Sequence, residues 1–257
     1  HTALAEAERV GACARAYSAS ALYNLAEVEF MRGRFSEADI YNQRAERVFA
    51  AAFGPDHFSL GQTGHRRAVI FQELGDLERA VDLYTASGEK LAGVLGENHP
   101  LVISSHTERA QALARLGRHD EALTLAQQAL RFSDQTEDGY AAVIAQATFG
   151  LVSYEADRED DALAALQTVR ALRADGNYPI IDEPPGLNIL AEIYLSKGNV
   201  AAAEEAIERA ISIQRQTGGQ SLDRIGESRR IFADLLIMKG EEERALRVAR
   251  QNVELAQ

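Results

Sequence analysis

The feature that most constrains this chain is a unit of 40 to 42 residues that occurs six times. Each unit has an anchor residue, an alanine five residues after it and a small residue seven residues before it. The anchors are Gly33, Gly75, Gly117, Asp157, Gly198 and Gly240; the alanines are Ala38, Ala80, Ala122, Ala162, Ala203 and Ala245; the earlier small residues are Ala26, Ala68, Ala110, Gly150, Ala191 and Ala233. Such a period predicts stacked supersecondary units rather than one globular core.

Each unit is predicted to form a helix, a tight turn and a second helix. The chain is rich in Ala, Leu, Glu and Arg, which lose little conformational freedom in a helix. Glycine at the anchor suits the backbone at a helix C-terminus. Acidic residues follow the anchor, where the dipole of the second helix favours negative charge: Glu37, Asp39, Glu78, Asp120, Glu121, Glu159, Asp160, Glu241 and Glu242. The sequence therefore predicts an all-α solenoid of helix hairpins.

The turns between units carry signals of their own. Gly54 and Gly96 are predicted helix stops, and Pro100 suits the first turn of the next helix. Asp56 or Asn98 is predicted to cap the helix that follows it. The stretch DGNYPIIDE at 175–183 is predicted to be the one clear loop and the segment most open to proteolysis.

This pattern resembles the tetratricopeptide repeat (TPR), whose small residues on both helices match the two columns above. The long period, together with LYNLA at 22–26, GRFSEA at 33–38 and LGENHPL at 95–101, is similar to the kinesin-light-chain type. The family's third small position falls on Ala45, Ser87, Ala129, Val169, Ala210 and Asn252 and is strict in three of them. The resemblance covers nearly the whole chain and implies a right-handed α-solenoid of antiparallel helix hairpins, the TPR superhelix. It also implies a bacterial signalling or regulatory protein.

We expect one continuous array over residues 1–257. Residues 1–17 fit the rear part of a preceding helix, which suggests an excerpt of a larger protein. The repeats are expected at about 18–56, 57–98, 99–138, 139–181, 182–220 and 221–257.

The composition and the absence of certain motifs disfavour several classes of function. A net charge of −12 disfavours direct binding to nucleic acid or to anionic membranes, although solubility alone also explains it. The single cysteine, Cys13, permits no internal disulfide and fits a cytoplasmic location. Catalytic and metal-binding motifs are absent, so we expect neither an enzyme nor a cofactor. His57 and His99 occupy equivalent turns, which favours a structural role.

The resemblance also places a binding surface. In TPR proteins the first helix of each repeat lines a concave groove. Only Asn24 matches the asparagine ladder with which kinesin light chains hold a peptide backbone. The register of the first helices gives the candidate partner-binding residues Tyr23, Asn24, Glu27, His65, Arg66, Gln72, Glu108, Gln111, Arg115, Asn188 and Glu192. Aromatic and Met residues on the same helices, such as Phe30 and Tyr154, fit a core role equally well.

Two functions remain open at this point. The first is a non-catalytic module that binds a peptide or a partner domain, including one of the same polypeptide. The alternative is a sensory or regulatory solenoid that controls an attached kinase, ATPase or transcription-factor domain.

Overall fold

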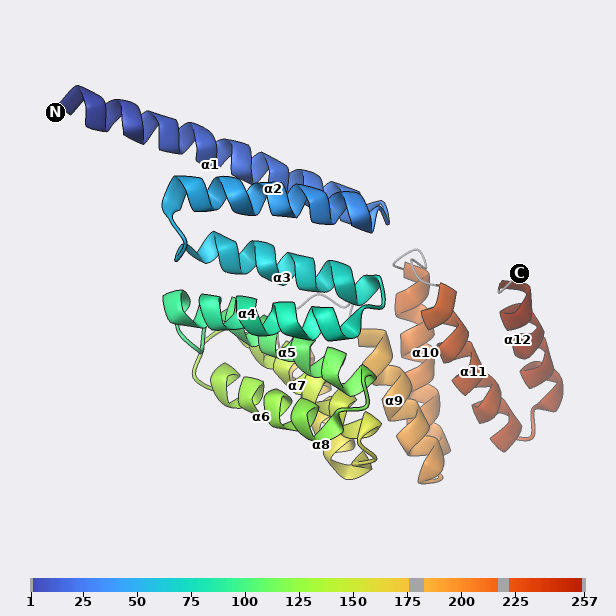
Figure 1. Cartoon of the computed structure of the whole chain (residues 1–257). Helices are drawn as coiled ribbons and strands as arrows, with labels where there is room; N and C mark the ends of the chain where they lie inside the picture. The colour runs from blue at the N-terminus through green and yellow to red at the C-terminus, as the bar shows by residue number, and fades with distance from the viewer. Residues whose placement is uncertain (1, 176–182, 217–221, 256–257) are drawn as a thin grey trace. The chain divides into compact units, whose positions relative to one another are not determined.

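The computed structural model describes residues 2–175, 183–216 and 222–255, and all regular secondary structure in these ranges is helical (Figure 1). This confirms the all-α prediction. The helices are α1 (Thr2–Met31), α2 (Phe35–Phe53), α3 (Phe58–Glu73), α4 (Leu77–Leu95), α5 (Pro100–Arg115), α6 (His119–Ser133), α7 (Gly139–Glu155), α8 (Glu159–Asp175), α9 (Glu183–Ser196), α10 (Val200–Gln216), α11 (Leu222–Met238) and α12 (Glu242–Leu255).

The helices pair as hairpins and divide into two compact units. Unit 1 comprises residues 1–148 and unit 2 comprises residues 149–257, so the division falls inside α7. In unit 1, α1 packs on α2, α3 on α4 and α5 on α6, while α2 also contacts α3 and α4 contacts α5. In unit 2, α9 packs on α10 and α11 on α12, with α10 also against α11. The first helices α3, α5, α9 and α11 are each covered by their own second helix and by that of the preceding repeat.

One boundary differs from the expectation. α1 runs without interruption from Thr2 to Met31, so residues 2–17 extend the first helix of the first hairpin instead of ending a separate helix. The loop predicted over 175–183 lies, apart from its two end residues, outside the residues that the structure describes.

The predicted turns within repeats form at every anchor. The anchor glycines have positive φ values, from 71° at Gly198 to 81° at Gly75. Asp157 replaces glycine in the fourth unit and still has φ 58°. Left-handed backbone is unfavourable for residues with a Cβ, and aspartate tolerates it better than most. The turn is therefore kept in the fourth unit at a conformational cost.

Histidines cap the helices that follow the turns between repeats. The imidazole Nδ1 of His57 accepts the Ser59 backbone N–H at 3.3 Å, and that of His99 accepts the Leu101 N–H at 3.2 Å. The structural role expected for these two histidines is confirmed. The prediction that Asp56 or Asn98 caps the following helix was wrong, because each lies one residue before the N-cap. The N-cap residue itself has the extended backbone that directs its side chain toward the N–H groups of the first turn.

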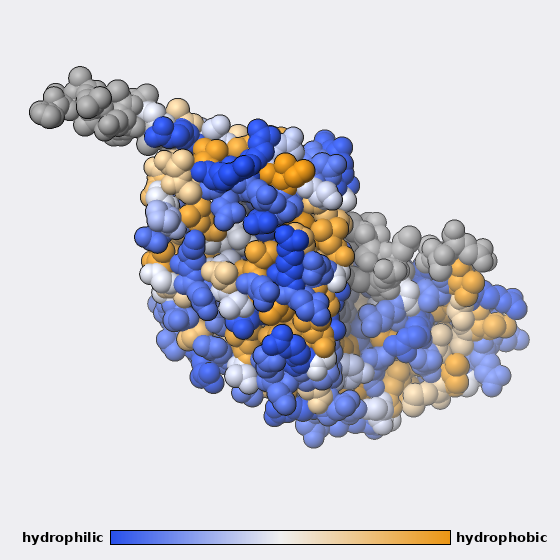
Figure 2. Space-filling view, in the orientation of Figure 1, coloured by the Kyte–Doolittle hydropathy of each residue, from blue (hydrophilic) through white to orange (hydrophobic). Residues whose placement is uncertain are grey.

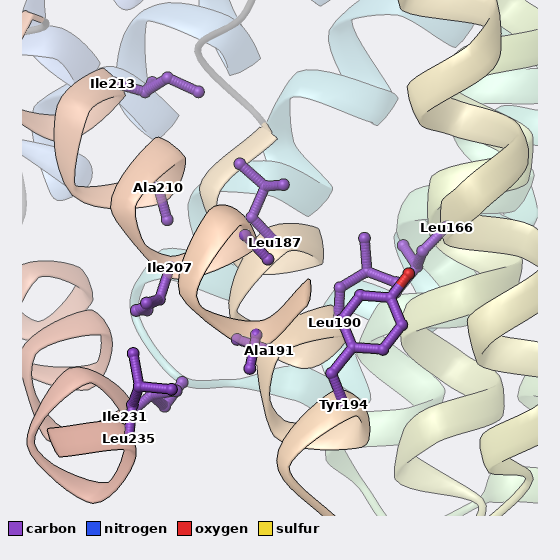
Figure 3. Packing of buried hydrophobic residues seen from close by; sticks show 12 residues of the cluster. Leu166, Leu187, Leu190, Ala191, Tyr194, Ile207, Ala210, Ile213, Ile231 and Leu235 are labelled. Atoms are coloured by element: carbon purple, nitrogen blue, oxygen red, sulfur yellow. The ribbon is translucent and has the colours of Figure 1, made fainter. Parts of the chain in front are cut away.

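Small residues allow the paired helices to approach closely. The five alanines that follow the first five anchors have no exposed surface, and Ala245 is nearly as buried. Of the earlier column, Ala26, Ala68, Ala110 and Ala191 are fully buried, whereas Ala233 is half-buried. Gly150 shows why size matters, since a Cβ there would lie 2.8 Å from Cγ of Leu166 on α8. The apolar core cluster of unit 2 contains side chains from α8, α9, α10 and α11 (Figure 3).

Candidate functional site

Side chains of neighbouring first helices meet in unit 1. We call the surface formed by Glu27, His65, Arg66, Glu108 and Gln111 the first-helix face. It joins α1, α3 and α5 through polar contacts between successive repeats. All five residues belong to the set predicted from the sequence.

The contact between α1 and α3 is an ion pair. Nη2 of Arg66 lies 2.7 Å from Oε2 of Glu27. The guanidinium also lies over the Phe30 ring, 5.6 Å from its centroid. A guanidinium held between a carboxylate and an aromatic ring presents its remaining N–H donors in a fixed orientation. Glu27 and Arg66 therefore adjoin across two repeats.

The contact between α3 and α5 is centred on Glu108. Its Oε2 lies 3.2 Å from Nε2 of His65, and it accepts a hydrogen bond from the Ser104 hydroxyl at 3.4 Å. Burial would raise the pKa of Glu108, but hydrogen bonding from His65, Tyr84 and Ser104 outweighs it and holds that pKa below its ordinary value. Burial and the nearby Glu108 raise the pKa of Tyr84. Glu108 is therefore kept ionised beside His65.

A neutral contact continues the series beyond α5. The Gln111 amide donates to the Thr148 hydroxyl at 3.1 Å. Gln111 lies six residues before its anchor and Thr148 nine before the next, and Glu27 and Arg66 occupy the same two positions. Two of the inter-repeat contacts thus use the same two positions of the first helix.

The first-helix face is partly open to solvent. The side chains of its four charged or titratable residues are between 19% and 39% exposed. Among the described residues, the buried Nδ1 of His65 and Nε of Arg66 have no hydrogen-bond partner. Buried polar atoms without a hydrogen-bond partner are uncommon in native proteins, so this face retains unused hydrogen-bonding capacity. Asn24 and Arg115 are exposed on the same first helices.

Three predicted residues have structural partners instead. Tyr23 is half-buried and packs against a core cluster of unit 1. Gln72 accepts a hydrogen bond from the buried Tyr84 hydroxyl at 3.4 Å. Asn188 is only 2% exposed; its Oδ1 accepts from the Ser228 hydroxyl at 2.8 Å, so it joins α9 to α11 from inside. We therefore leave these residues out of the first-helix face.

Unit 2 has its own polar series. The Tyr154 hydroxyl on α7 donates to Glu192 on α9 at 2.8 Å, and Glu192 also pairs with Arg230 on α11. Burial, helped by Glu192, raises the pKa of Tyr154 to about 12. The candidate set contained Glu192 but neither of its partners. Glu192 lies six residues before its anchor, as Glu27 does. Arg230 lies ten residues before the next anchor, one position from that of Arg66, so the Glu27–Arg66 pair could have identified Arg230 as a partner.

A hollow of about 700 Å³ lies beside Tyr154 in unit 2. Its lining is largely acidic, although Lys197 pairs with Asp160 at 3.0 Å and Arg158 with Asp161 at 2.6 Å. The lining residues are Tyr154, Glu155, Asp157, Arg158, Glu159, Asp160, Asp161 and Lys197. Within the described ranges, no group of three or more His, Cys, Asp or Glu side chains is placed to hold a metal ion. A search of the same ranges finds no helix long and apolar enough to cross a membrane.

The fold resembles that of several solved proteins. One is a kinesin-light-chain-type protein of Podospora anserina, whose TPR-like repeats are nearly identical to one another. Its sequence is 22% identical to this chain, and the aligned region covers 77% of this chain and 95% of that protein, with a TM-score of 0.60. Aspartyl phosphate phosphatase F of Bacillus subtilis is 15% identical over 96% of this chain and 61% of its own, with a TM-score of 0.72. A Rap protein complexed with competence and sporulation factor is 16% identical over 91% and 74%, with a TM-score of 0.65. At these identities the likeness concerns the fold alone.

Family models agree with the fold. No curated protein matches the chain. A tetratricopeptide repeat model matches residues 17–89 and 65–135, and a second model of the same description matches 185–217. The matched residues make up more than half of the chain, and they include α2 to α6, most of α9 and all of α10. The chain therefore belongs to the tetratricopeptide repeat family.

Proposed function

We propose that the chain is a non-catalytic module that binds an extended peptide, or an extended segment of a partner protein, on the first-helix face of unit 1. Tetratricopeptide repeats are generally protein-interaction modules, and one structural neighbour is a Rap protein in complex with competence and sporulation factor. The observation that carries the proposal is the meeting of Glu27 with Arg66 and of His65 with Glu108 across successive repeats.

This arrangement suits an extended peptide for two physical reasons. Groups of both signs alternate along the face, so they can accept from and donate to the N–H and C=O groups of a peptide backbone. Their neighbours fix them in place, which lowers the entropy lost on binding. Arg66 and the exposed Asn24 supply donors at the α1–α3 end, and Gln111 and the exposed Arg115 continue the surface along α5. Arginine is also enriched among residues that dominate binding energy.

The first prediction concerns Arg66. A random peptide library displayed on phage is panned against the whole chain, and the affinity of an enriched peptide is measured by calorimetry. Arg66→Glu should weaken that affinity at least tenfold, because it removes the fixed donors and places a carboxylate beside Glu27. Arg44→Glu is the matched control, since Arg44 is exposed on α2, a second helix. Circular dichroism should show the same helical content in both variants.

Two results would contradict the proposal. Panning could enrich no peptide that binds the free chain. Alternatively, an enriched peptide could bind Arg66→Glu and Asn24→Ala as tightly as it binds the unaltered protein. Either result would remove the first-helix face as the recognition surface.

A regulatory role is the second candidate. The observation in its favour is that the division between the two compact units falls inside α7, between Thr148 and Phe149, instead of in a turn. A ligand held by one unit could then act on the other through a continuous helix. A pair of fluorophores, one on α3 and one on α11, should change its transfer efficiency when an enriched peptide binds. An unchanged efficiency would leave binding alone as the function.

A further inference from the structure

Unit 1 shows which positions touch where one repeat packs on the next. Arg67 on α3 lies eight residues before its anchor, Gly75. Its Nε is 2.6 Å from Oδ1 of Asp39, and its Nη1 is 3.6 Å from Oε2 of Glu46. These two carboxylates lie on α2, six and thirteen residues after the preceding anchor. The eighth position before an anchor therefore fits between the sixth and thirteenth positions after the anchor of the preceding repeat.

Unit 2 places apolar side chains at the same positions. Phe232 on α11 occupies the eighth position, and Ile211 on α10 occupies the thirteenth of the preceding repeat. Both pack against the core cluster of Figure 3. In the repeat before, Leu190 on α9 occupies the eighth position and Leu163 on α8 occupies the sixth position after the preceding anchor, and both belong to the same apolar packing. These positions thus hold ion-paired side chains in unit 1 and apolar side chains of one packed cluster in unit 2.

One half of this contact is uncovered on α12. Leu246 and Val253 occupy its sixth and thirteenth positions and are 53% and 60% exposed. The residues at the position of Leu246 in two inner repeats, Val81 and Leu123, are buried. Figure 2 shows hydrophobic atoms on the surface of the last hairpin, at the right of the view. We call Leu246 and Val253 the α12 stripe.

The other half is uncovered on α1. Leu25 occupies the eighth position and is 44% exposed, and Val28, one turn further along, is 43% exposed. We call these two residues the α1 stripe. The residues at the position of Val28 in the other repeats are at most 1% exposed: Ile70, Ala112, Val152, Ile193 and Leu235. The α1 stripe therefore lacks the cover that every later first helix has at this position.

We propose that two copies of the chain associate head to tail, with Leu25 of one copy packing between Leu246 and Val253 of the other. The occupant is a second copy because the α1 stripe is already helical, apolar and in the register that the α12 stripe requires. Burial of four apolar side chains provides the driving force. Because the two stripes differ, the contact is heterologous and each copy keeps one stripe free, so the assembly grows beyond a dimer as concentration rises.

Sedimentation velocity of the whole chain over a wide concentration range tests the proposal. The average mass should rise with concentration. Leu25→Glu and Leu246→Glu should each remain monomeric, because each places a carboxylate in the apolar contact. Ile40→Glu, which alters another exposed apolar side chain on α2, is the matched control and should associate like the unaltered protein.

Mixing the two monomeric variants gives the most specific result. The Leu25→Glu copy keeps an intact α12 stripe, and the Leu246→Glu copy keeps an intact α1 stripe. An equimolar mixture should therefore form a dimer and stop there, because the remaining stripe of each copy is blocked. A chain that is monomeric at every concentration would overturn the proposal. Association that survives both substitutions, or a mixture that stays monomeric, would overturn it as well.

Discussion

At the scale of single residues, the interior of unit 1 contains a buried polar side chain at a position that is apolar or aromatic in the next four repeats. Asn42 on α2 is fully buried, and neither its Nδ2 nor its Oδ1 has a hydrogen-bond partner among the described residues. Buried polar atoms without partners are destabilising, by about 1 to 3 kcal/mol. The same position holds apolar or aromatic residues in the next four repeats: Tyr84, Ala126, Leu166 and Ile207.

Asn42→Leu should therefore raise the free energy of unfolding by about 1 to 3 kcal/mol, because it removes the unsatisfied amide and keeps a similar volume. Urea denaturation followed by circular dichroism measures the change. Asn42→Ala is the control that removes the amide but leaves a cavity, and it should gain less. A loss of stability in Asn42→Leu would mean that Asn42 has a partner such as an ordered water.

Glu108 is the residue that makes the first-helix face sensitive to acid. Its pKa in the folded chain lies below the ordinary value of 4.5. It therefore contributes stability that is fully present above the unfolded pKa and is lost as pH falls through the lower, folded pKa. Other carboxylates titrate in the same range, so the informative quantity is the difference between the unaltered protein and Glu108→Gln.

That difference should shrink below about pH 4.5, because protonation removes from the unaltered protein the charge that Glu108→Gln already lacks. Urea midpoints measured for both proteins from neutral pH down to the acid limit of folding provide the test. Glu37→Gln, which removes an exposed carboxylate from the first turn of α2, is the control. A difference that stays constant with pH would show that the charge of Glu108 contributes nothing to folding.

At the scale of elements, the turn inside the fourth repeat is the least favourable of its kind. Asp157 has positive φ where the other five repeats have glycine. Asp157→Gly should raise the free energy of unfolding by about 1 kcal/mol, because glycine adopts this conformation without a Cβ clash. Asp157→Ala removes the same carboxylate but keeps the clash, so it should give no gain. Equal effects of the two changes in thermal denaturation would assign the gain to charge instead.

The elements also show what the sequence could and could not predict. The hairpins were predictable because an alanine after each anchor and a turn-forming residue at it recur with a fixed period. The capping residues were not predictable, because the sequence indicates only a general structural role for His57, while its neighbour Asp56 has the more common capping side chain. Burial at the site was also missed, since Asn188 and Asn24 lie within one residue of the same repeat position, yet one is buried and the other exposed.

At the scale of the whole molecule, repeats that contact mainly their neighbours create surfaces by repetition. The positions six residues before one anchor and nine or ten before the next hold Glu27 and Arg66, Gln111 and Thr148, and Glu192 and Arg230. The fold supplies the spacing, and the sequence decides at each step whether the contact is charged or neutral. Recognition of a partner should depend on that local choice more than on the fold, which unrelated proteins share.

The most direct test of this account exchanges the two members of one ion pair. Glu27→Arg combined with Arg66→Glu restores an attraction between α1 and α3 but reverses its polarity. The account predicts stability close to that of the unaltered protein, and an affinity for the enriched peptide at least tenfold weaker in calorimetry. Full affinity in the doubly substituted protein would contradict it, because the pair would then serve only to join two helices.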